Sequence, residues 1–258
     1  MDYVAGIDIG SATTKVVILT DHKIFASSLI PTGPDSAETA TLAMNRALER
    51  TNLSLANIRF IVATGYGRII VPFSHAILTE ISCHAKGAHF IFPAARTILD
   101  MGGQDCKAIR LDEGGVQTNF AMNDKCAAGT GRFLEAMART LNLPLESLGP
   151  LSLEAQQEVK ISNMCAVFAK SEVSYLVRKG LSKNDILAGL HEAISERVHA
   201  LLKRVGIEPL FVITGGIAKN IGVVRKLEEK IGLTAHIPPE PQLVGALGAA
   251  LFATERAG

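Results

Sequence analysis

Short apolar runs alternate with amphipathic segments along the whole chain of 258 residues. Three runs near the start, at about 3–9, 14–20 and 24–31, have the length and content of strands, with a turn at 20–23. Alternation of strands with helices along one chain predicts an α/β fold. The later pattern predicts strands at 60–64, 97–99, 107–111, 116–122 and 210–214, and helices at about 36–51, 79–91, 130–141, 168–179, 183–204 and 243–254.

The composition, 48% hydrophobic and 20% charged with a net charge of +1, is that of an ordinary globular protein. A nearly neutral chain with 5% aromatic residues and no tryptophan has little with which to hold nucleic acid, so no nucleic-acid partner is expected. Neither a signal-peptide pattern nor an apolar run of about 20 residues is present, so we expect a cytoplasmic protein with no membrane partner.

One stretch of the sequence occurs twice. Residues 8–15 read Asp-Ile-Gly-Ser-Ala-Thr-Thr-Lys, and residues 100–107 read Asp-Met-Gly-Gly-Gln-Asp-Cys-Lys. Aspartate, glycine and lysine recur at the same offsets, and each copy lies between two apolar runs. The repeat predicts two similar α/β lobes that offer matching turns to one shared ligand. We place the first lobe at 1–96 and the second at 97–242, with a C-terminal helix at about 243–258 returning to the first lobe.

Each copy of the repeat has the residues of a phosphate-binding turn. Glycine allows close backbone approach, and successive N–H groups form an anion-binding concavity. Asp8 and Asp100 are candidate Mg²⁺ ligands and catalytic carboxylates, and Gln104, or less favourably Asp105, could orient an attacking water. For one copy alone, an ordinary turn with a surface lysine is the better explanation, but two copies make coincidence a poor explanation. The candidate nucleotide contacts here are Gly10, Ser11, Ala12, Thr13, Thr14, Lys15, Gly102, Gly103 and Gln104.

Two further glycine-rich junctions precede predicted helices, where backbone N–H groups favour phosphate. The first is at 129–132, and the second, at 213–220, has adjacent glycines that let a ribose or a flat base lie against the backbone. Neither a Walker P-loop nor a convincing Gly-x-Gly-x-x-Gly pattern is present, so the binding mode is neither Walker nor Rossmann. The candidate contacts are Gly129, Thr130, Gly131, Gly215, Gly216, Ala218 and Asn220.

Together these motifs resemble the acetate/sugar kinase–actin–heat-shock-chaperone superfamily. The resemblance implies a duplicated ribonuclease-H-like (actin-like) two-lobe ATPase fold. Four segments, at 63–68, 100–105, 123–135 and 165–169, closely resemble the activators of 2-hydroxyacyl-CoA dehydratases, to which the ATPase subunits of benzoyl-CoA reductase are related. The resemblance covers essentially the whole chain.

The family resemblance implies a homodimer with one [4Fe-4S] cluster, ligated by Cys126 and Cys165 of each chain. Spacing alone does not assign these two cysteines, but two chains supply the four thiolates that such a cluster needs. Cys83 and Cys106 are expected to be packing residues. The resemblance also implies ATP/ADP and Mg²⁺ as ligands. ATP hydrolysis would drive an electron from reduced ferredoxin or flavodoxin to a partner dehydratase.

Three alternatives remain open: an ATPase subunit of a benzoyl-CoA-reductase-type complex, a small-molecule kinase of the same superfamily, and a nucleotide-dependent interaction module. The acyl-CoA substrate is also open, because its pocket lies on the partner. One position departs from the family pattern, since Lys170 follows Cys-Ala-Val-Phe-Ala where an acidic residue is usual. A positive charge there would raise the reduction potential of a nearby cluster, but the simpler interpretation is a solvated side chain with no redox effect.

Overall fold

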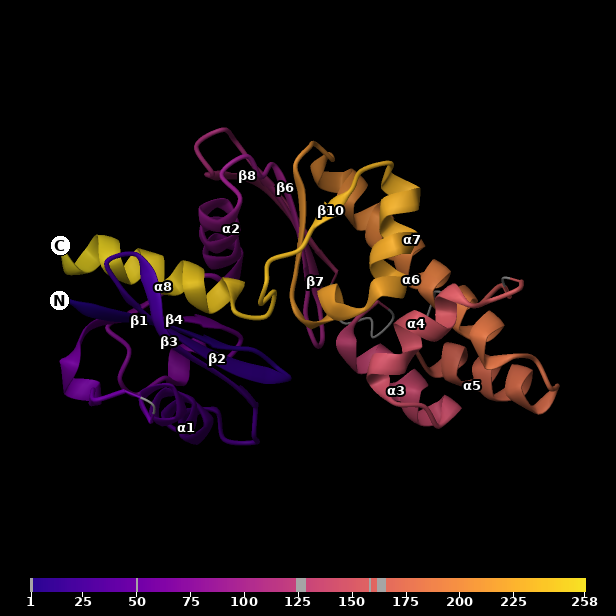
Figure 1. Cartoon of the computed structure of the whole chain (residues 1–258), viewed down its shortest axis with the longest axis horizontal. Helices are drawn as coiled ribbons and strands as arrows, with labels where there is room; N and C mark the ends of the chain where they lie inside the picture. The colour runs from indigo at the N-terminus through magenta and orange to yellow at the C-terminus, as the bar shows by residue number, and fades with distance from the viewer. Residues whose placement is uncertain (1, 50, 124–128, 158, 162–165) are drawn as a thin grey trace.

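The computed structural model describes residues 2–49, 51–123, 129–157, 159–161 and 166–258, and these form two α/β lobes side by side (Figure 1). Both ends of the chain lie in the first lobe, where helix α8 (Val244–Ala257) lies across the first sheet. Helix α2 (Glu80–Ile91) stands between the first lobe and the sheet of the second. The arrangement leaves the two sheets facing a shared junction.

The first lobe is a five-stranded sheet in the order β3-β2-β1-β4-β5. The strands β1, β2 and β3 form an antiparallel meander, and β4 and β5 continue it in parallel. Apolar residues cover both faces of the central strand, one packed against α1 and the other against α8. The elements are β1 (Tyr3–Ile9), β2 (Thr13–Thr20), β3 (Lys23–Pro31), α1 (Ser36–Leu48), β4 (Ile58–Gly65) and β5 (Ala76–Ile77), with 3₁₀ turns at Leu55–Asn57 and Arg68–Ile70.

The second lobe repeats this plan, with its sheet in the order β8-β7-β6-β9-β10. Again three antiparallel strands are followed by two parallel ones. This shared topology confirms the predicted duplicated actin-like α/β fold. The elements are β6 (Thr97–Met101), β7 (Cys106–Leu111), β8 (Gln117–Asn123), α3 (Gly131–Leu141), α4 (Leu148–Leu153), α5 (Ala166–Arg178), α6 (Lys183–Val205), β9 (Phe211–Thr214), α7 (Ile221–Ile231) and β10 (Ala235–His236), with 3₁₀ turns at Leu145–Ser147 and Gly216–Lys219.

Three glycines allow α8 to approach its neighbours at backbone distance. A Cβ atom on Gly6 of β1 would overlap the backbone of α8 at Ala246. A Cβ atom on Gly87 of α2 would overlap the carbonyl of Val244, and one on Gly248 of α8 would overlap that of Cys83. The close packing of α8 against both β1 and α2 therefore depends on the absence of a Cβ atom at these three glycines.

The predicted elements agree with the structure except at short or irregular segments. The first helix ends at Leu48 rather than at 51, and the helix expected at 168 begins at Ala166. A 3₁₀ turn intervenes after the two adjacent glycines, so α7 begins only at Ile221. The two-residue strands β5 and β10 and the six-residue α4 are too short to give a periodic signal. The division into domains at residue 96 stays a prediction.

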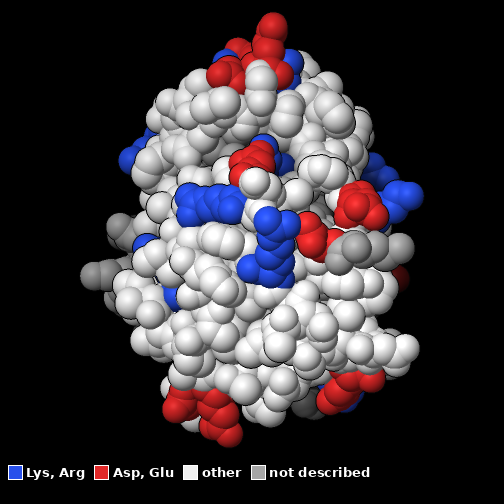
Figure 2. Space-filling model, turned by 90° about the vertical axis from the view of Figure 1, so that its left-hand side faces the viewer, with Lys and Arg blue, Asp and Glu red and all other residues white. Residues whose placement is uncertain are grey.

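Uncharged residues cover most of the surface at the first-lobe end of the molecule, where basic and acidic side chains are interspersed (Figure 2). Among the helices of the described residues, none combines the length and the apolar character needed to cross a membrane.

Replacing Gly248 with alanine should destabilise the protein, although alanine is the better helix former by about 1 kcal/mol. The added methyl group has to displace the α2 backbone at Cys83, and overpacking of this kind costs about 1–3 kcal/mol. Urea unfolding would measure the difference. Gly114→Ala is a suitable control, because its Cβ would lie at an ordinary 3.5 Å from Asp112. Equal stabilities of the two variants would contradict the role given to Gly248.

Candidate functional site

A cleft of about 960 Å³ lies between the lobes, and it is lined by both copies of the repeat and by the turn at Gly215 and Gly216. The first lobe supplies the turn after β1, and the second supplies the turn after β6 and the turn after β9. Most of the nucleotide contacts predicted from sequence line this cleft: Gly10, Ser11, Ala12, Thr13, Lys15, Gly102, Gly103, Gln104, Thr130, Gly131, Gly215, Gly216 and Asn220.

Three other predicted contacts are buried beside the cleft and are not part of its lining. Thr14 is fully buried, and its hydroxyl lies 2.9 Å from that of Thr32. Ala218 packs into the core of the second lobe, and Gly129 is also buried. The structure therefore places these three residues as supports of the turns, and direct contact with a nucleotide stays a prediction for them.

The two repeated turns have the same local geometry and face each other. The N–H of Gly10 donates to the carbonyl of Thr13 at 3.0 Å, and the N–H of Gly102 donates to that of Asp105 at 2.9 Å. A Cβ atom on Gly103 would lie 2.7 Å from the Cβ of Ala12. The turns thus approach from opposite lobes to contact distance, as expected if both hold one ligand.

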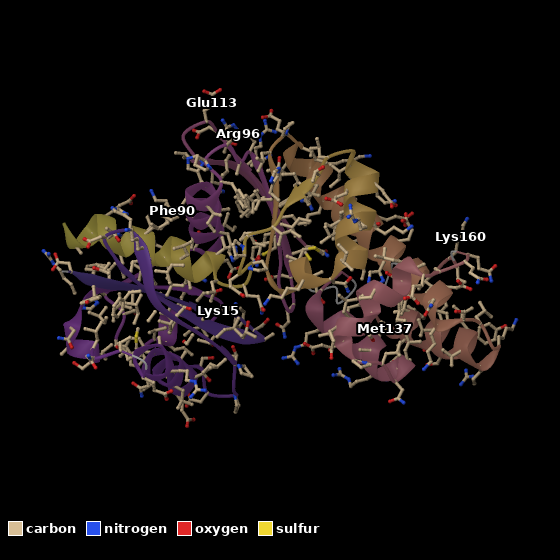
Figure 3. All side chains as sticks on the ribbon, viewed as in Figure 1. Lys15, Phe90, Arg96, Glu113, Met137 and Lys160 are labelled. Carbon is tan, nitrogen blue, oxygen red and sulfur yellow. The ribbon has the colours of Figure 1, made fainter. Side chains whose placement is uncertain are left out.

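Each repeat places an aspartate beside its lysine on neighbouring antiparallel strands. Asp8 pairs in register with Lys15, and Asp100 with Lys107. The Lys15 Nζ lies 3.0 Å from the Asp8 carboxylate, and Lys15 faces the junction between the lobes (Figure 3). The Lys107 Nζ lies 3.6 Å from Asp100, 2.6 Å from Asp105 and 3.1 Å from Glu80. The seven-residue offset in the repeat is therefore the spacing of an ion pair across a hairpin.

The charges at the second turn stabilise one another inside the protein. Burial alone would raise the pKa of Asp100, but His84, Lys107, Lys15 and a hydrogen bond from Thr214 lower it below its ordinary value. Burial alone would lower the pKa of Lys107, yet the nearby carboxylates raise it above its ordinary range. Both groups are therefore charged at neutral pH, because each supplies the opposite charge that makes burial of the other tolerable.

Sequence reasoning missed a second repeat at the ends of the parallel strands. Thr64-Gly65 ends β4 beside Asp8, and Thr214-Gly215 ends β9 beside Asp100. Both glycines have a positive φ, 85° and 84°, and a Cβ atom on either would crowd the neighbouring aspartate. This second repeat did have a signal in the sequence, because each half contains an apolar run followed by a threonine–glycine pair.

Two residues of α2 and one lysine of β7 were also missed as parts of the site. Glu80 and His84 line the cleft, as does Lys107. His84 is buried, with its Nδ1 3.2 Å from the Thr214 hydroxyl. The spacing Glu80…His84, one turn of a helix, was the only sequence signal available.

The loop that begins α3 is joined directly to the second phosphate turn. The N–H groups of Gly131 and Arg132 donate to the carbonyls of Gly102 and Gly103 at 3.0 and 2.9 Å. The Cys106 thiol donates to the carbonyl of Gly129 at 2.8 Å. A displacement of the turn would therefore also displace the start of α3.

On the other side of the cleft, Asn220 caps α7 and is held by a buried histidine. Its Oδ1 accepts from the Val223 N–H at 3.1 Å and lies 3.0 Å from His191 Nε2. Burial lowers the pKa of His191. This arrangement fixes the Asn220 side chain at the margin of the cleft.

The two cysteines assigned to the cluster, Cys126 and Cys165, lie outside the described residues. Cys83 and Cys106 are free and fully buried, as packing residues should be. Burial raises the pKa of the Cys83 thiol to about 12 and also raises that of Cys106. Within the described part of the chain, no three His, Cys, Asp or Glu side chains gather as metal ligands.

Comparison with known proteins identifies the chain by family. Residues 5–253 match the model of the BadF/BadG/BcrA/BcrD ATPase family. The activator of lactoyl-CoA dehydratase from Anaerotignum propionicum is 47% identical over 99% of this chain and 98% of its own length. A benzoyl-CoA reductase subunit from Thauera aromatica is 33% identical, over 99% and 94%. The family is one of ATPases, which favours an ATPase over a small-molecule kinase.

Two solved structures have nearly the same fold. Component A of the (R)-2-hydroxyglutaryl-CoA dehydratase of Acidaminococcus fermentans superposes with a TM-score of 0.95 at 43% identity, covering 100% of this chain and 99% of that one. The activator of the 2-hydroxyisocaproyl-CoA dehydratase of Clostridium difficile, solved with bound ADPNP, gives 0.94 at 43% identity, covering 99% and 95%.

Replacing Lys107 with methionine should destabilise the fold by about 3–5 kcal/mol, because it leaves the buried Asp100 carboxylate without its lysine. Chemical denaturation at neutral pH would measure the loss. Arg59→Met removes an exposed ion pair with Asp2 and should change stability by less than about 1 kcal/mol. A Lys107→Met protein as stable as the Arg59→Met control would show that this buried pair is not needed for folding.

Proposed function

Because the chain belongs to the BadF/BadG/BcrA/BcrD ATPase family, we propose that it hydrolyses ATP in the interlobe cleft and uses the energy to deliver a low-potential electron to a 2-hydroxyacyl-CoA dehydratase. The observation that carries this proposal is the pair of matched turns, one from each lobe, that meet at Gly103 and Ala12. A nucleotide bound by both turns connects the two lobes. Its hydrolysis would therefore change the contacts that hold the two turns together.

The roles of the cleft residues follow from their chemistry. The turns after β1 and β6 supply backbone N–H groups for the phosphates. The carboxylates of Asp8 and Asp100 are hard oxygen donors that suit Mg²⁺, held directly or through water, and Mg²⁺ there would neutralise phosphate charge. Gly215 and Gly216 leave room for the ribose or the base beside Asn220.

Between the two candidates for orienting the attacking water, the contacts favour Gln104. Asp105 accepts an ion-paired hydrogen bond from Lys107 at 2.6 Å, which ties it to the charge cluster. Gln104 is exposed within the cleft and lies in the turn between Gly103 and Asp105. A glutamine amide can hold a water at hydrogen-bond distance from a phosphate.

Electron transfer is assigned to a [4Fe-4S] cluster shared by a homodimer and ligated by Cys126 and Cys165 of each chain. Such a cluster supplies one electron at a low potential, taken from reduced ferredoxin or flavodoxin. The element order supports these ligands, because α5 begins at Ala166, directly after Cys165, and α3 begins at Gly131, shortly after Cys126. Helix N-termini favour thiolates and anionic groups. The exposed Lys170 of α5 would raise the cluster potential.

The partner is a 2-hydroxyacyl-CoA dehydratase rather than a benzoyl-CoA-reductase-type complex. The greater identity to the lactoyl-CoA dehydratase activator, 47% against 33% for the reductase subunit, supports this choice. The acyl group belongs to the partner's pocket. An anaerobic assay with dithionite-reduced protein, ATP and a purified dehydratase tests the proposal, since ATP-dependent dehydration of the acyl-CoA is required.

The cluster assignment predicts about four iron atoms per dimer, and a brown colour, in protein reconstituted anaerobically. Cys126→Ser or Cys165→Ser should lose both, whereas Cys83→Ala and Cys106→Ala should retain them because those thiols are buried in the core. Iron analysis, absorbance and size-exclusion chromatography would be measured together. A colourless wild-type protein, or a monomer that holds iron, would contradict the assignment.

Replacing Gln104 with alanine should lower the kcat for ATP hydrolysis by about 10²-fold, the effect of losing a group that assists proton or water placement. The KM for ATP should change little, because the phosphate turns retain their backbone donors. Gln117→Ala, on β8 and outside the cleft lining, is the matched control. If Asp105→Asn lost more kcat than Gln104→Ala, the water would have to be assigned to Asp105.

A further inference from the structure

Helix α2 presents two side chains from the first lobe to the catalytic turn of the second. Glu80 and His84 are one helical turn apart, so they share a face, and both line the cleft. On the same helix, Gly87 and Cys83 lie against α8 at backbone distance, which fixes α2 to the first lobe. The residues of the second lobe that Glu80 and His84 contact are therefore connected to the first lobe through α2.

His84 contacts Asp100 through a threonine hydroxyl, and its Nδ1 also lies 3.6 Å from the Asp100 carboxylate. The Thr214 Oγ1 donates its single hydrogen to Asp100 Oδ1 at 3.1 Å, so toward His84 it can only accept. The His84 Nδ1, 3.2 Å away, is therefore the donor. All three side chains are buried, at 7% exposure or less. His84 thus fixes the hydroxyl that points at the Asp100 carboxylate.

Glu80 acts on the same turn through Lys107. Its carboxylate lies 3.1 Å from the Lys107 Nζ, which also contacts Asp105 and Asp100. The first lobe has a simpler arrangement, in which Asp8 lies 3.0 Å from Lys15. In the second lobe the corresponding distance is 3.6 Å, and a carboxylate from the opposite lobe shares the lysine.

We propose that Glu80 and His84 are positioning residues of the ATPase, which join Lys107 and Asp100 of the second lobe to the first lobe and so set the spacing of the two phosphate turns for hydrolysis. The inference rests on the proposed ATPase activity. Hydrolysis needs both turns placed to within about 1 Å. On the side of the cleft assigned to the ribose or base, Asn220 is held by His191 rather than by α2, and the phosphate turns keep their backbone donors without Glu80 or His84. The two residues therefore affect kcat rather than KM.

Three substitutions of His84 separate this role from simple filling of space. The side-chain amide nitrogen of asparagine takes the place of imidazole Nδ1, whereas that of glutamine takes the place of Nε2. His84→Ala and His84→Gln should lower the kcat of ATP hydrolysis by about 10-fold or more, up to the 10²-fold cost of a misplaced reacting group. His84→Asn should restore most of it, with the KM for ATP unchanged in all three. A residue that only filled space would be replaced better by the larger glutamine.

The second arm of the test uses Glu80→Gln, which retains shape but loses the charge paired with Lys107. It should lower kcat without changing KM. Lys86→Met is the matched control, since Lys86 is on the same helix and its ion pair with Glu255 is exposed. That variant should retain wild-type kcat. Thermal unfolding of every variant, with and without ADPNP, would separate loss of fold from loss of positioning.

The results of these assays distinguish failure of the positioning role from failure of the proposed ATPase activity. Wild-type kcat in both His84→Ala and Glu80→Gln would overturn the positioning role while leaving the proposed ATPase intact. An asparagine variant no better than the glutamine variant would also overturn it. A wild-type protein that hydrolyses no ATP would instead defeat the proposed function itself.

Discussion

Lys107 is a buried cation, and the structure around the cleft is organised to neutralise it. An ammonium group removed from water is costly unless carboxylates replace the lost solvation. Lys107 is surrounded by Asp100 and Asp105 of its own lobe and by Glu80 of the other. Three carboxylates around one lysine leave net negative charge at the second turn, which suits a magnesium-bound nucleotide. Through Glu80 the same charge cluster joins α2 to the second sheet, beside the apolar packing of α2 against that sheet.

The contacts of the second turn suggest how nucleotide state would reach the rest of the second lobe. The turn is hydrogen-bonded to the start of α3 through Gly102 and Gly103, and to Gly129 through the Cys106 thiol. A shift of the turn would therefore also move Gly129 and the first residues of α3.

The two lobes share one arrangement of site residues but differ in the contacts that surround it. In each half an aspartate near the end of the first strand pairs with a lysine seven residues later, and a Thr-Gly pair lies beside that aspartate. The first copy is simple and leaves Asp8 with Lys15. The second copy has gained cross-lobe links from α2. The two halves therefore hold their turns with different sets of contacts.

The fold could largely be predicted from the sequence, because apolar periodicity and glycine turns are local signals. The hairpins, most helix bounds and the repeat of Asp, Gly and Lys at fixed offsets followed from it, and the repeat implied the duplication before any strand order was known. The very short β5 and β10 left no periodic trace, and their existence depends on neighbouring strands. The 3₁₀ turn at Gly216–Lys219 likewise follows from packing beside the cleft.

The residues of the candidate site likewise fall into two groups, those that local sequence could identify and those that it could not. The residues in its glycine-rich turns could be chosen from sequence because the turns are contiguous in the chain. Glu80, His84 and Thr214 could not, since their chemistry depends on partners that are distant in sequence: His84 lies 130 residues from Thr214 and becomes a donor only because that hydroxyl already serves Asp100. The sequence by itself determined where phosphate could be held. The tertiary structure alone decided which buried charges and hydroxyls fix those turns, because burial and long-range contact create their roles.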